Sequence, residues 1–485
     1  MEELDTTEGI HLRGEGEFTF PTAGGRVRLS VTDDALTPYG GLVPWAAFTK
    51  HLGMVEQLAE DCPVQRTSPN AAPVYDVLQS FMLTALTDGR RFSHVERLRE
   101  DPTIPELFGM EAVVSDDTVR RFFKSVDPVL GAEWMARHVQ PMWGALPERI
   151  IMDWDSTVQP KYGHQEGAVV GYNPGKPGRR SFHPLLGVVA HTRLCPAYRF
   201  RSGDTVTATQ WHAAMEDAQR WLGERKVWLN RGDLGLGHDA VMAWHEERAD
   251  RPHFLFKLKL TRGVRTALQE VPEASWQGPA SQGAWQVAEG SLRLLGWPRS
   301  RRVIFARQLQ GTVPAAKHGE FWDQTKHEFA VYVTNLALDY NGWQIQQLYR
   351  ERADTENVFD ELKNQWGFSG FCAKARATTE LAARLLLMVY NLWVLFVRFI
   401  VPHRHTEAKR GRRWFLLIAA RLVQSGRQKE VQISVRGGWA QQLRDGYVRL
   451  YEWIRTTAPQ LKTIVRIPAQ TTAASSPAGP NGRLI

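Results

Sequence analysis

Cysteine is scarce in this sequence of 485 residues, which contains only Cys62, Cys195 and Cys372. The three are far apart, so they match neither a disulfide framework nor a zinc ribbon. The first residues are acidic and include no apolar segment of the kind that defines a secretory signal. These absences argue against a disulfide-rich secreted protein and lead us to expect a reducing, cytoplasmic location.

Long apolar runs are scarce too, since only residues 381–400 have roughly the length of a membrane span. This run contains Arg384, Asn391 and Arg398, and no second run of this kind accompanies it. A helix inside a large protein can also be apolar on every side. We therefore predict a buried core helix here and expect no membrane partner.

Positive charge is in excess, because 60 Lys and Arg residues stand against 52 Asp and Glu residues and the sequence pI is about 9.4. Residues 401–450 alone contain eleven basic and three acidic residues, so their excess equals that of the whole chain. Such a concentrated basic segment favours a polyanionic partner. We predict that it contacts nucleic-acid phosphates, with Arg410, Arg412 and Arg413 among the contacts.

The hydrophobic pattern divides the chain into regions of different secondary structure. After two short strands the N-terminal region is predicted to be mainly helical. One of its helices, with Arg120, Arg121 and Lys124, is either the recognition helix of a helix-turn-helix or an ordinary packing helix. From residue 148, strands alternate with helices, which predicts an α/β domain with a mixed sheet. The predicted regions are 1–147 (N-terminal, mainly helical), 148–255 (first part of the α/β core), 256–335 (β-rich insertion), 336–400 (rest of the core), 401–466 (basic helical region) and 467–485 (disordered tail).

Acidic residues mark the ends of two predicted strands. In RIIMDWDST, Asp153 and Asp155 lie on one face because side chains alternate along a strand. Asp233 follows the strand KVWLN and is bordered by glycines, which is typical of a ligand site at the carboxyl end of a strand. The structural alternatives are an exposed edge strand for the first two acids and a turn or helix cap for Asp233.

Residues 346–368 are predicted to form one helix of mixed charge. At about 100° per residue, one face of this helix carries a phenol, two cations and a carboxylate: Tyr349, Arg352, Glu356 and Lys363. Ion pairs on a solvent-exposed helix would explain such a stripe. A site that holds a metal and handles phosphate would explain it as well. Asp155, Asp233 and Glu356 would then supply oxygen ligands for two Mg²⁺ or Mn²⁺ ions, which can promote phosphodiester displacement.

The spacing of these four helix residues resembles the Tyr-Arg-Glu-Lys signature of a large group of DDE-class insertion-sequence transposases. The segments LTPYGGL and DWDSTVQPKYGHQEGAVVGYNPGKPGRR are similar to segments of one branch of that group. The resemblance implies a ribonuclease H-like mixed sheet with a β-rich insertion, flanked by mainly helical regions. It also implies that Asp155 is the first carboxylate, because the family has a Thr two residues after it, as Thr157 is here. Asp153 remains a rival metal ligand because it shares the face.

The implied function is that of a DNA transposase near the bacterial nucleoid. It would bind double-stranded DNA at the terminal inverted repeats of its element as a homodimer, and it would catalyse metal-dependent strand cleavage and strand transfer. A catalytically silent DNA-binding protein and a host DNA nuclease of the same fold remain alternatives.

The transposase hypothesis also predicts DNA contacts for residues outside the carboxylates. Arg352 and Lys363 would hold scissile-strand phosphates, and Tyr349 would hydrogen-bond a phosphate or order the helix. A loop between strands with Lys176, Arg179 and Arg180 is either a further DNA contact or an ordinary solvated basic loop. Spacing leaves the base-flipping aromatic of the family open among Trp276, Trp285, Trp297 and Trp322.

Overall fold

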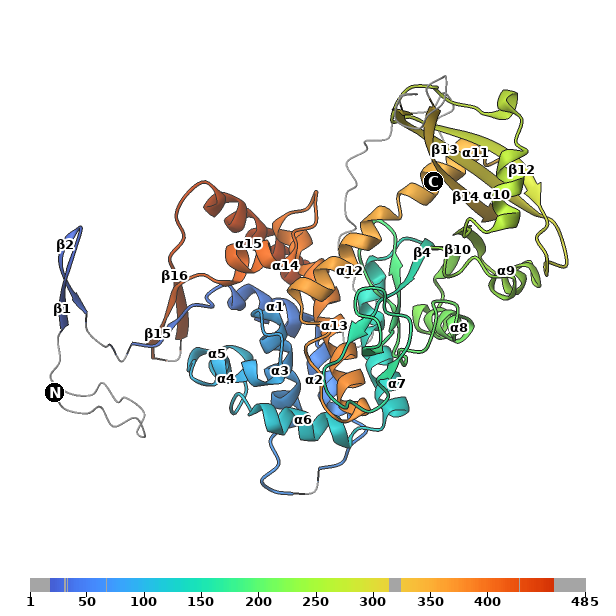
Figure 1. Ribbon diagram of the computed structural model, residues 1–485. Coiled ribbons are helices and arrows are strands. Elements are labelled where there is room, and N and C mark those ends of the chain that lie inside the picture. The colour runs from blue at the N-terminus through green and yellow to red at the C-terminus, as the bar shows by residue number, and fades with distance from the viewer. Residues whose placement is uncertain are drawn as a thin grey trace, which may run out of the picture.

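The computed structural model describes residues 18–457, apart from residues 30, 31, 33, 67, 314–323 and 427. Its centre is a sheet whose strands are, in spatial order, β12 (Trp285–Leu292), β13 (Arg301–Val313), β14 (Gln324–Thr334), β11 (His253–Lys257), β10 (Lys226–Gly232), β4 (Arg149–Ser156), β8 (Leu185–Val189) and β9 (Ala197–Arg199) (Figure 1). β4, β10 and β11 are mutually parallel, whereas β8, β9, β12, β13 and β14 pair in antiparallel fashion. The predicted mixed sheet is confirmed.

Helices cover both faces of this sheet. They are α8 (Trp211–Leu222) and α9 (Asp239–Glu246) on one face, and α11 (Gly342–Arg350) and α12 (Ala353–Gln365) on the other. On the first face the ring of Trp154 lies 5.9 Å from that of Trp211 in α8. On the second face Ile345 of α11 joins a separate apolar cluster with residues of β10 and β11. Because side chains alternate, Asp153 and Asp155 point away from α8 and towards α11 and α12.

The strands of the predicted β-rich insertion extend the central sheet instead of forming a sheet of their own. β14 pairs with β11 on one side and with β13 on the other. Two short elements, α10 (Arg262–Gln269) and the 3₁₀ turn η3 (Glu273–Ser275), connect β11 to β12. The insertion is therefore continuous with the edge of the core.

The N-terminal part is helical from residue 42, after the β1–β2 hairpin (Phe18–Thr22 and Gly25–Leu29) that lies apart at the left of Figure 1. Its α-helices are α1 (Leu42–Leu52), α2 (Met54–Glu60), α3 (Val74–Leu86), α4 (Glu96–Arg99), α5 (Thr103–Phe108), α6 (Asp116–Ser125) and α7 (Pro128–Val139), with 3₁₀ turns at Phe92–Val95 and Gln140–Ala145. In α6, Arg120 pairs with Asp116 at 2.6 Å and Arg121 pairs with Asp117 at 2.6 Å. Since α6 also packs against α3 and α13, the arrangement favours the packing helix over the recognition helix.

The apolar run forms most of α13 (Arg376–Ile400), which contacts α3, α6 and α7 of the N-terminal part (Figure 1). Within the described chain it is the one helix long and apolar enough to cross a membrane, and 94% of its most apolar window is buried in the protein. Its polar residues bind inside the protein. The Asn391 amide accepts from the backbone N–H of Cys195 at 2.8 Å and donates to the carbonyl of Cys195 at 3.1 Å. Arg398 donates to the carbonyl of Thr192 at 3.1 Å. These contacts agree with the predicted core helix.

The C-terminal part is not purely helical, so that prediction was wrong for residues 420–433. It contains α14 (Ala408–Gly411), a π-helical turn (Arg412–Leu416), β15 (Ala420–Ser425), β16 (Gln428–Ile433) and α15 (Trp439–Thr456). β15 also pairs with β3 (Leu36–Thr37), so strands from the two ends of the chain share one small sheet. This pairing with distant residues could not be read from local helical periodicity.

Candidate active site

Two carboxylates lie side by side at the carboxyl ends of adjacent parallel strands. The register pairs Trp154 of β4 with Gly232, the last residue of β10, so Asp155 of β4 and Asp233, which directly follows β10, are neighbours. The Asp155 side chain is 24% exposed. Burial raises the pKa of the Asp155 carboxyl and the charge of Asp233 raises it further, while Arg352 acts in the opposite direction. Two neighbouring carboxylates of this kind supply the oxygen donors that a hard divalent cation prefers.

Asp153 does not belong to this pair, and its predicted metal-ligand role is contradicted. It is 1% exposed, and its two oxygens accept from Nε and Nη2 of Arg231 at 2.6 and 2.8 Å. The Thr355 hydroxyl donates to the same carboxylate at 2.8 Å. Burial, the charge of Arg231 and these three hydrogen bonds neutralise the Asp153 carboxylate inside the protein, so we assign it a structural role.

Arg352 lies at a break in the predicted helix. α11 ends at Arg350 and α12 begins at Ala353, so the segment forms two helices and the prediction of one helix was wrong. The Nη2 atom of Arg352 lies 3.2 Å from Oδ2 of Asp155 and donates to the Trp154 carbonyl at 3.0 Å. Burial alone would lower the pKa of Arg352, but the negative charge of Asp155 raises it above its usual value. Arg352 is thus an internal counter-ion to the carboxylates.

Tyr349 lies at the same place, at the end of α11. Its ring packs on Tyr332 of β14, with 4.5 Å between ring centroids. Burial raises the pKa of the Tyr349 phenol to about 12; Arg352 opposes this effect, whereas Asp233 and Asp155 add to it. The phenol therefore keeps its proton at neutral pH and can act as a hydrogen-bond donor.

Glu356 and Lys363 are exposed on α12, one and three helical turns beyond Arg352. Neither takes part in an ion pair within the described residues, which contradicts a stripe of surface ion pairs for these two. The same described residues contain no assembled group of three acidic, His or Cys side chains that could hold a metal. The structure thus brings together Asp155, Asp233 and Arg352 with Tyr349, and leaves Glu356 apart from them.

A family comparison decides the class of protein. The family model for the transposase DDE domain group 1 matches residues 21–453. The chain belongs to this family. No curated protein matches the sequence.

Two solved structures are similar to this transposase. One is the cryo-EM structure of the piggyBac transposase synaptic complex with hairpin DNA, with 11% identity, a TM-score of 0.40, and coverage of 89% of this chain and 86% of that chain. The other is the Drosophila P element transposase strand transfer complex, with 12% identity, a TM-score of 0.23, and coverage of 46% of this chain and 49% of that chain.

The basic loop of the transposase begins directly beside the carboxylates. It leaves β4 after Ser156 and returns to β8 at Leu185, and it contains the small sheet of β5 (Gln159–Pro160), β7 (Arg180–Phe182) and β6 (Val169–Val170). Lys176, Arg179 and Arg180 are exposed on it. Lys176 and Arg179 both lie 4.8 Å from the ring centre of Tyr162, which is 68% exposed. Sequence analysis identified the three cations but missed this tyrosine.

Of the three C-terminal arginines predicted to contact DNA, Arg410 and Arg413 are exposed but Arg412 is not. Arg412 is 2% exposed and donates to the carbonyls of Ala85, Leu86 and Gln365 at 2.9, 2.7 and 2.5 Å. It joins the end of α3 to the end of α12, where a cation also complements the helix dipoles. The prediction of a DNA contact was therefore wrong for Arg412.

The tryptophan candidates for base flipping are not separated by the structure. Trp276 lies 4.4 Å from the Arg307 guanidinium, Trp285 lies 6.0 Å from that of Arg350, and Trp297 is only 8% exposed. Trp322 lies outside the described residues.

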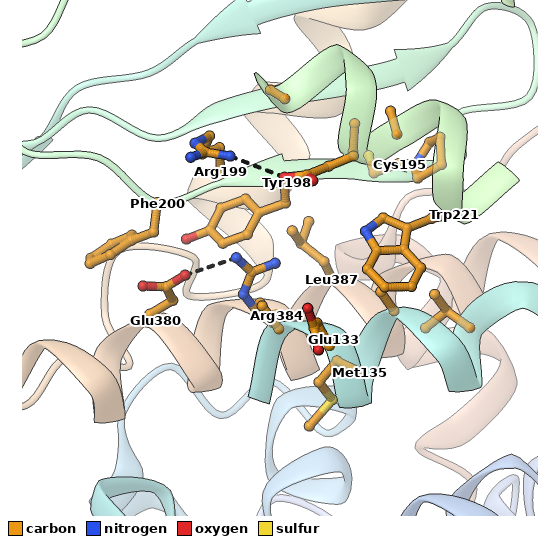
Figure 2. Close-up of a pocket in the computed structure, with 18 of the residues that line it drawn as sticks. Glu133, Met135, Cys195, Tyr198, Arg199, Phe200, Trp221, Glu380, Arg384 and Leu387 are labelled. Atoms are coloured by element: carbon orange, nitrogen blue, oxygen red, sulfur yellow. Dashed lines mark hydrogen bonds and ion pairs between the residues drawn. The ribbon is translucent and has the colours of Figure 1, made fainter. Parts of the chain in front are cut away.

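A cavity of about 540 Å³ lies away from the carboxylates, among α7, α8, β9 and α13 (Figure 2). None of Asp155, Asp233 and Glu356 lines it. Three of its four arginines pair with lining acids, since Arg384 lies 2.8 Å from Glu380, and Asp217 lies 3.0 Å from Arg199 and 2.6 Å from Arg220 (Figure 2 shows Arg384 facing Glu380). The fourth, Arg376, takes part in no ion pair within the described residues, and its Nη2 donates to the Phe200 carbonyl at 3.4 Å.

The different surroundings of the two β4 acids predict different effects on stability. Asp153→Asn leaves the buried Arg231 guanidinium with only the half-exposed Glu351, 3.8 Å away, as a counter-charge, and should lower the free energy of unfolding by about 3–5 kcal/mol. Asp155→Asn should cost less, because Asp155 is partly exposed, its loss relieves repulsion with Asp233, and the charges of Asp153 and Asp233 still act on the buried Arg352. Urea unfolding of the metal-free variants measures both, and equal losses in the two would contradict the assignment of Asp153 as structural.

Proposed function

We propose that the chain is the transposase of an insertion sequence, and that it binds the terminal inverted repeats of its element, cleaves the DNA at the ends and joins them to target DNA by cut and paste. The observation that carries the proposal is the pair of Asp155 and Asp233 at the ends of two parallel strands, with Arg352 and Tyr349 beside it. Membership of the DDE transposase family supports DNA cleavage and strand transfer as the reaction.

The strand order supports a ribonuclease H-like core within the larger sheet. Its five strands lie in the order β9-β8-β4-β10-β11, with three antiparallel strands followed by two strands parallel to β4. In chain order, Asp155 lies near the end of the first of these strands, β4, and Asp233 directly follows the fourth, β10. This places the proposed site at a carboxyl edge, where α/β sheets bind their ligands.

Asp155 and Asp233 would hold Mg²⁺ or Mn²⁺ at this edge, and their donor chemistry fits such ions. Glu356, which lies apart from them on α12, would be the third ligand of a two-ion site. When bound, these ions activate the attacking oxygen and stabilise the leaving oxygen of an in-line phosphodiester displacement. Arg352 offsets the charge of the carboxylates. The protonated phenol of Tyr349 can donate to a phosphate oxygen.

The DNA partner would lie across the exposed cations next to this edge. The loop with Lys176, Arg179 and Arg180 begins two residues after Asp155, and Lys363 is free to reach a phosphate from α12. Arg410 and Arg413 extend the basic surface in the C-terminal part. We further propose a homodimer on the DNA and a location in the bacterial cytoplasm, at the nucleoid.

The central prediction concerns the three carboxylates. Asp155→Asn, Asp233→Asn and Glu356→Gln each remove a ligand charge at nearly constant shape, so each should abolish Mg²⁺-dependent cleavage and leave repeat binding intact. The assay is incubation with DNA that carries the repeats flanking its locus, with Asp339→Asn as an exposed control. Full cleavage by any one variant would remove that residue from the site. Wild-type cleavage without joining would indicate a nuclease, and binding without cleavage a silent DNA-binding protein.

Lys363 tests the role of α12. If Lys363 holds a phosphate, Lys363→Ala should slow cleavage or joining at least about tenfold, which corresponds to roughly 1.4 kcal/mol of barrier, without loss of thermal stability. Lys226→Ala is the matched control, because Lys226 is an exposed lysine at the opposite end of β10. Normal rates of cleavage and joining in Lys363→Ala would show that Lys363 is an ordinary surface residue with no role in the reaction.

The C-terminal arginines should separate into two classes. Arg410→Ala and Arg413→Ala should weaken binding to specific and random duplexes alike, and each should flatten the logarithmic salt dependence by up to about 0.9. Arg412→Ala should instead lower thermal stability, because the carbonyls it binds lose a buried donor. Fluorescence anisotropy across a salt series and thermal unfolding measure these effects. An unchanged salt slope in the first two variants would remove them from the DNA surface.

A further inference from the structure

Ser156, the residue directly after Asp155, is the centre of a hydrogen-bond network that the proposed chemistry does not use. Its hydroxyl lies 2.9 Å from Nε2 of His183 and 2.8 Å from the hydroxyl of Thr207. His183 lies at the end of the basic loop, and Thr207 lies in the connection between β9 and α8. Two segments that are distant in sequence therefore meet at the residue beside the first carboxylate.

The direction of these hydrogen bonds follows from the surroundings of His183. Its Nδ1 lies 2.6 Å from the carbonyl oxygen of Thr205, which can only accept, so Nδ1 carries the proton. Nε2 must then accept from the Ser156 hydroxyl. Ser156 in turn accepts from Thr207. His183 is 6% exposed, and this burial lowers the pKa of its imidazole, which keeps the ring in the neutral form that the network requires.

Arg201 closes this network into a ring. It is 1% exposed, and its Nε donates to the backbone carbonyl of His183 at 2.9 Å. Its Nη1 donates to the carbonyls of Val206 and Thr207 at 3.0 and 3.1 Å. One rigid guanidinium thus fixes the backbone of both residues that hold the Ser156 hydroxyl.

The same ring touches the second carboxylate. A Cβ added to Gly235 would lie 2.4 Å from the Thr207 hydroxyl oxygen, so the two segments are in direct contact. The backbone N–H of Gly235 donates to Oδ1 of Asp233 at 2.9 Å. The ring therefore borders Asp155 through Ser156 and Asp233 through Gly235.

We propose that His183 is a positioning residue of this transposase, which acts through Ser156 and Thr207 to hold Asp155 and Asp233 at the separation that a divalent cation needs. The inference rests on the proposed function for its catalytic meaning, but its effect on metal affinity can be measured without DNA. Loss of the hydrogen bond between His183 and Ser156 should loosen both carboxylate segments.

Two substitutions of His183 separate its two hydrogen bonds. The side chain of His183→Gln reaches the position of Nε2, and its carbonyl oxygen can accept from Ser156. The side chain of His183→Asn reaches only the position of Nδ1, so it can donate to Thr205 but leaves Ser156 without its acceptor. Ser156→Ala removes the shared hydroxyl and provides an independent variant with a small change in volume.

Mn²⁺ binding to the full-length protein, measured by calorimetry or electron paramagnetic resonance, is the first readout, and strand cleavage is the second. We expect His183→Asn and Ser156→Ala each to weaken Mn²⁺ binding at least about tenfold, which is about 1.4 kcal/mol, and His183→Gln to stay within about threefold of the wild type. The double variant His183→Asn/Ser156→Ala should be no worse than either single variant, because both remove one interaction.

Unchanged Mn²⁺ affinity in Ser156→Ala, or equal losses in the Asn and Gln variants, would overturn the positioning role. Additive losses in the double variant would overturn it as well. A wild-type protein that binds Mn²⁺ with this pattern but cleaves no DNA would contradict the proposed function and leave the positioning role supported.

Discussion

The buried ion pair between Asp153 and Arg231 is the constraint on which the rest of the site depends. The two residues face each other in the register of β4 and β10, and the Asp153 and Arg231 side chains are 1% and 0% exposed. Neither charge can be buried alone, so the pair fixes the register of these two strands. Arg231 also donates to the Leu348 carbonyl of α11, and Thr355 of α12 donates to Asp153. One interaction therefore joins two strands and two helices.

This pair determines where the unpaired acids lie. Side chains repeat on one face every two residues, so Asp155 and Asp233 lie one step further along the same face as Asp153 and Arg231. Asp153 and Arg231 neutralise each other as an internal ion pair. Asp155 and Asp233 are both acidic, and Arg352 compensates their charge only in part. The two acids proposed to bind a divalent cation thus lie directly next to an ion pair that is already neutral.

The opposed charges of α12 have a different origin from surface ion pairs. Glu361 is fully buried; it accepts from the backbone N–H of Ala408 at 3.0 Å and lies 2.8 Å from His405. Asp354 pairs with Arg193 of the β8–β9 turn at 2.6 Å. Burial alone would raise the pKa of Glu361, yet its hydrogen bond from His405 lowers it overall, so this carboxylate is held ionised. Several of the charges on α12 therefore attach it to the core and to the C-terminal part, and Glu356 and Lys363 are left exposed.

The sequence predicted those parts of the site that depend on side-chain alternation along a strand and on the position of strand ends. Alternation placed Asp153 and Asp155 on one face, and the glycines after Asp233 marked a strand end. The sequence could not show which of the two acids is neutralised within the protein. The neutralisation of Asp153 depends on Arg231 from another strand and on a strand register that local sequence does not specify. His183 escaped notice for the same reason, since its partners Ser156 and Thr207 are distant in sequence and meet only in the folded chain.

The composition of residues 401–450 predicted a negatively charged partner, but it overestimated how many of the basic residues are available to contact that partner. Within residues 401–450, Arg412 is buried and Arg449 donates to the carbonyls of Phe399 and Ile400 at 2.8 and 3.1 Å. Arg421 pairs with Asp34 at 2.9 Å. These cations bind the C-terminal part to α13 and to the N-terminal part. Each therefore already has partners within the protein. A guanidinium bound to backbone carbonyls releases no counterion from a phosphate, and the basic surface for DNA is therefore smaller than the net charge of the segment suggests.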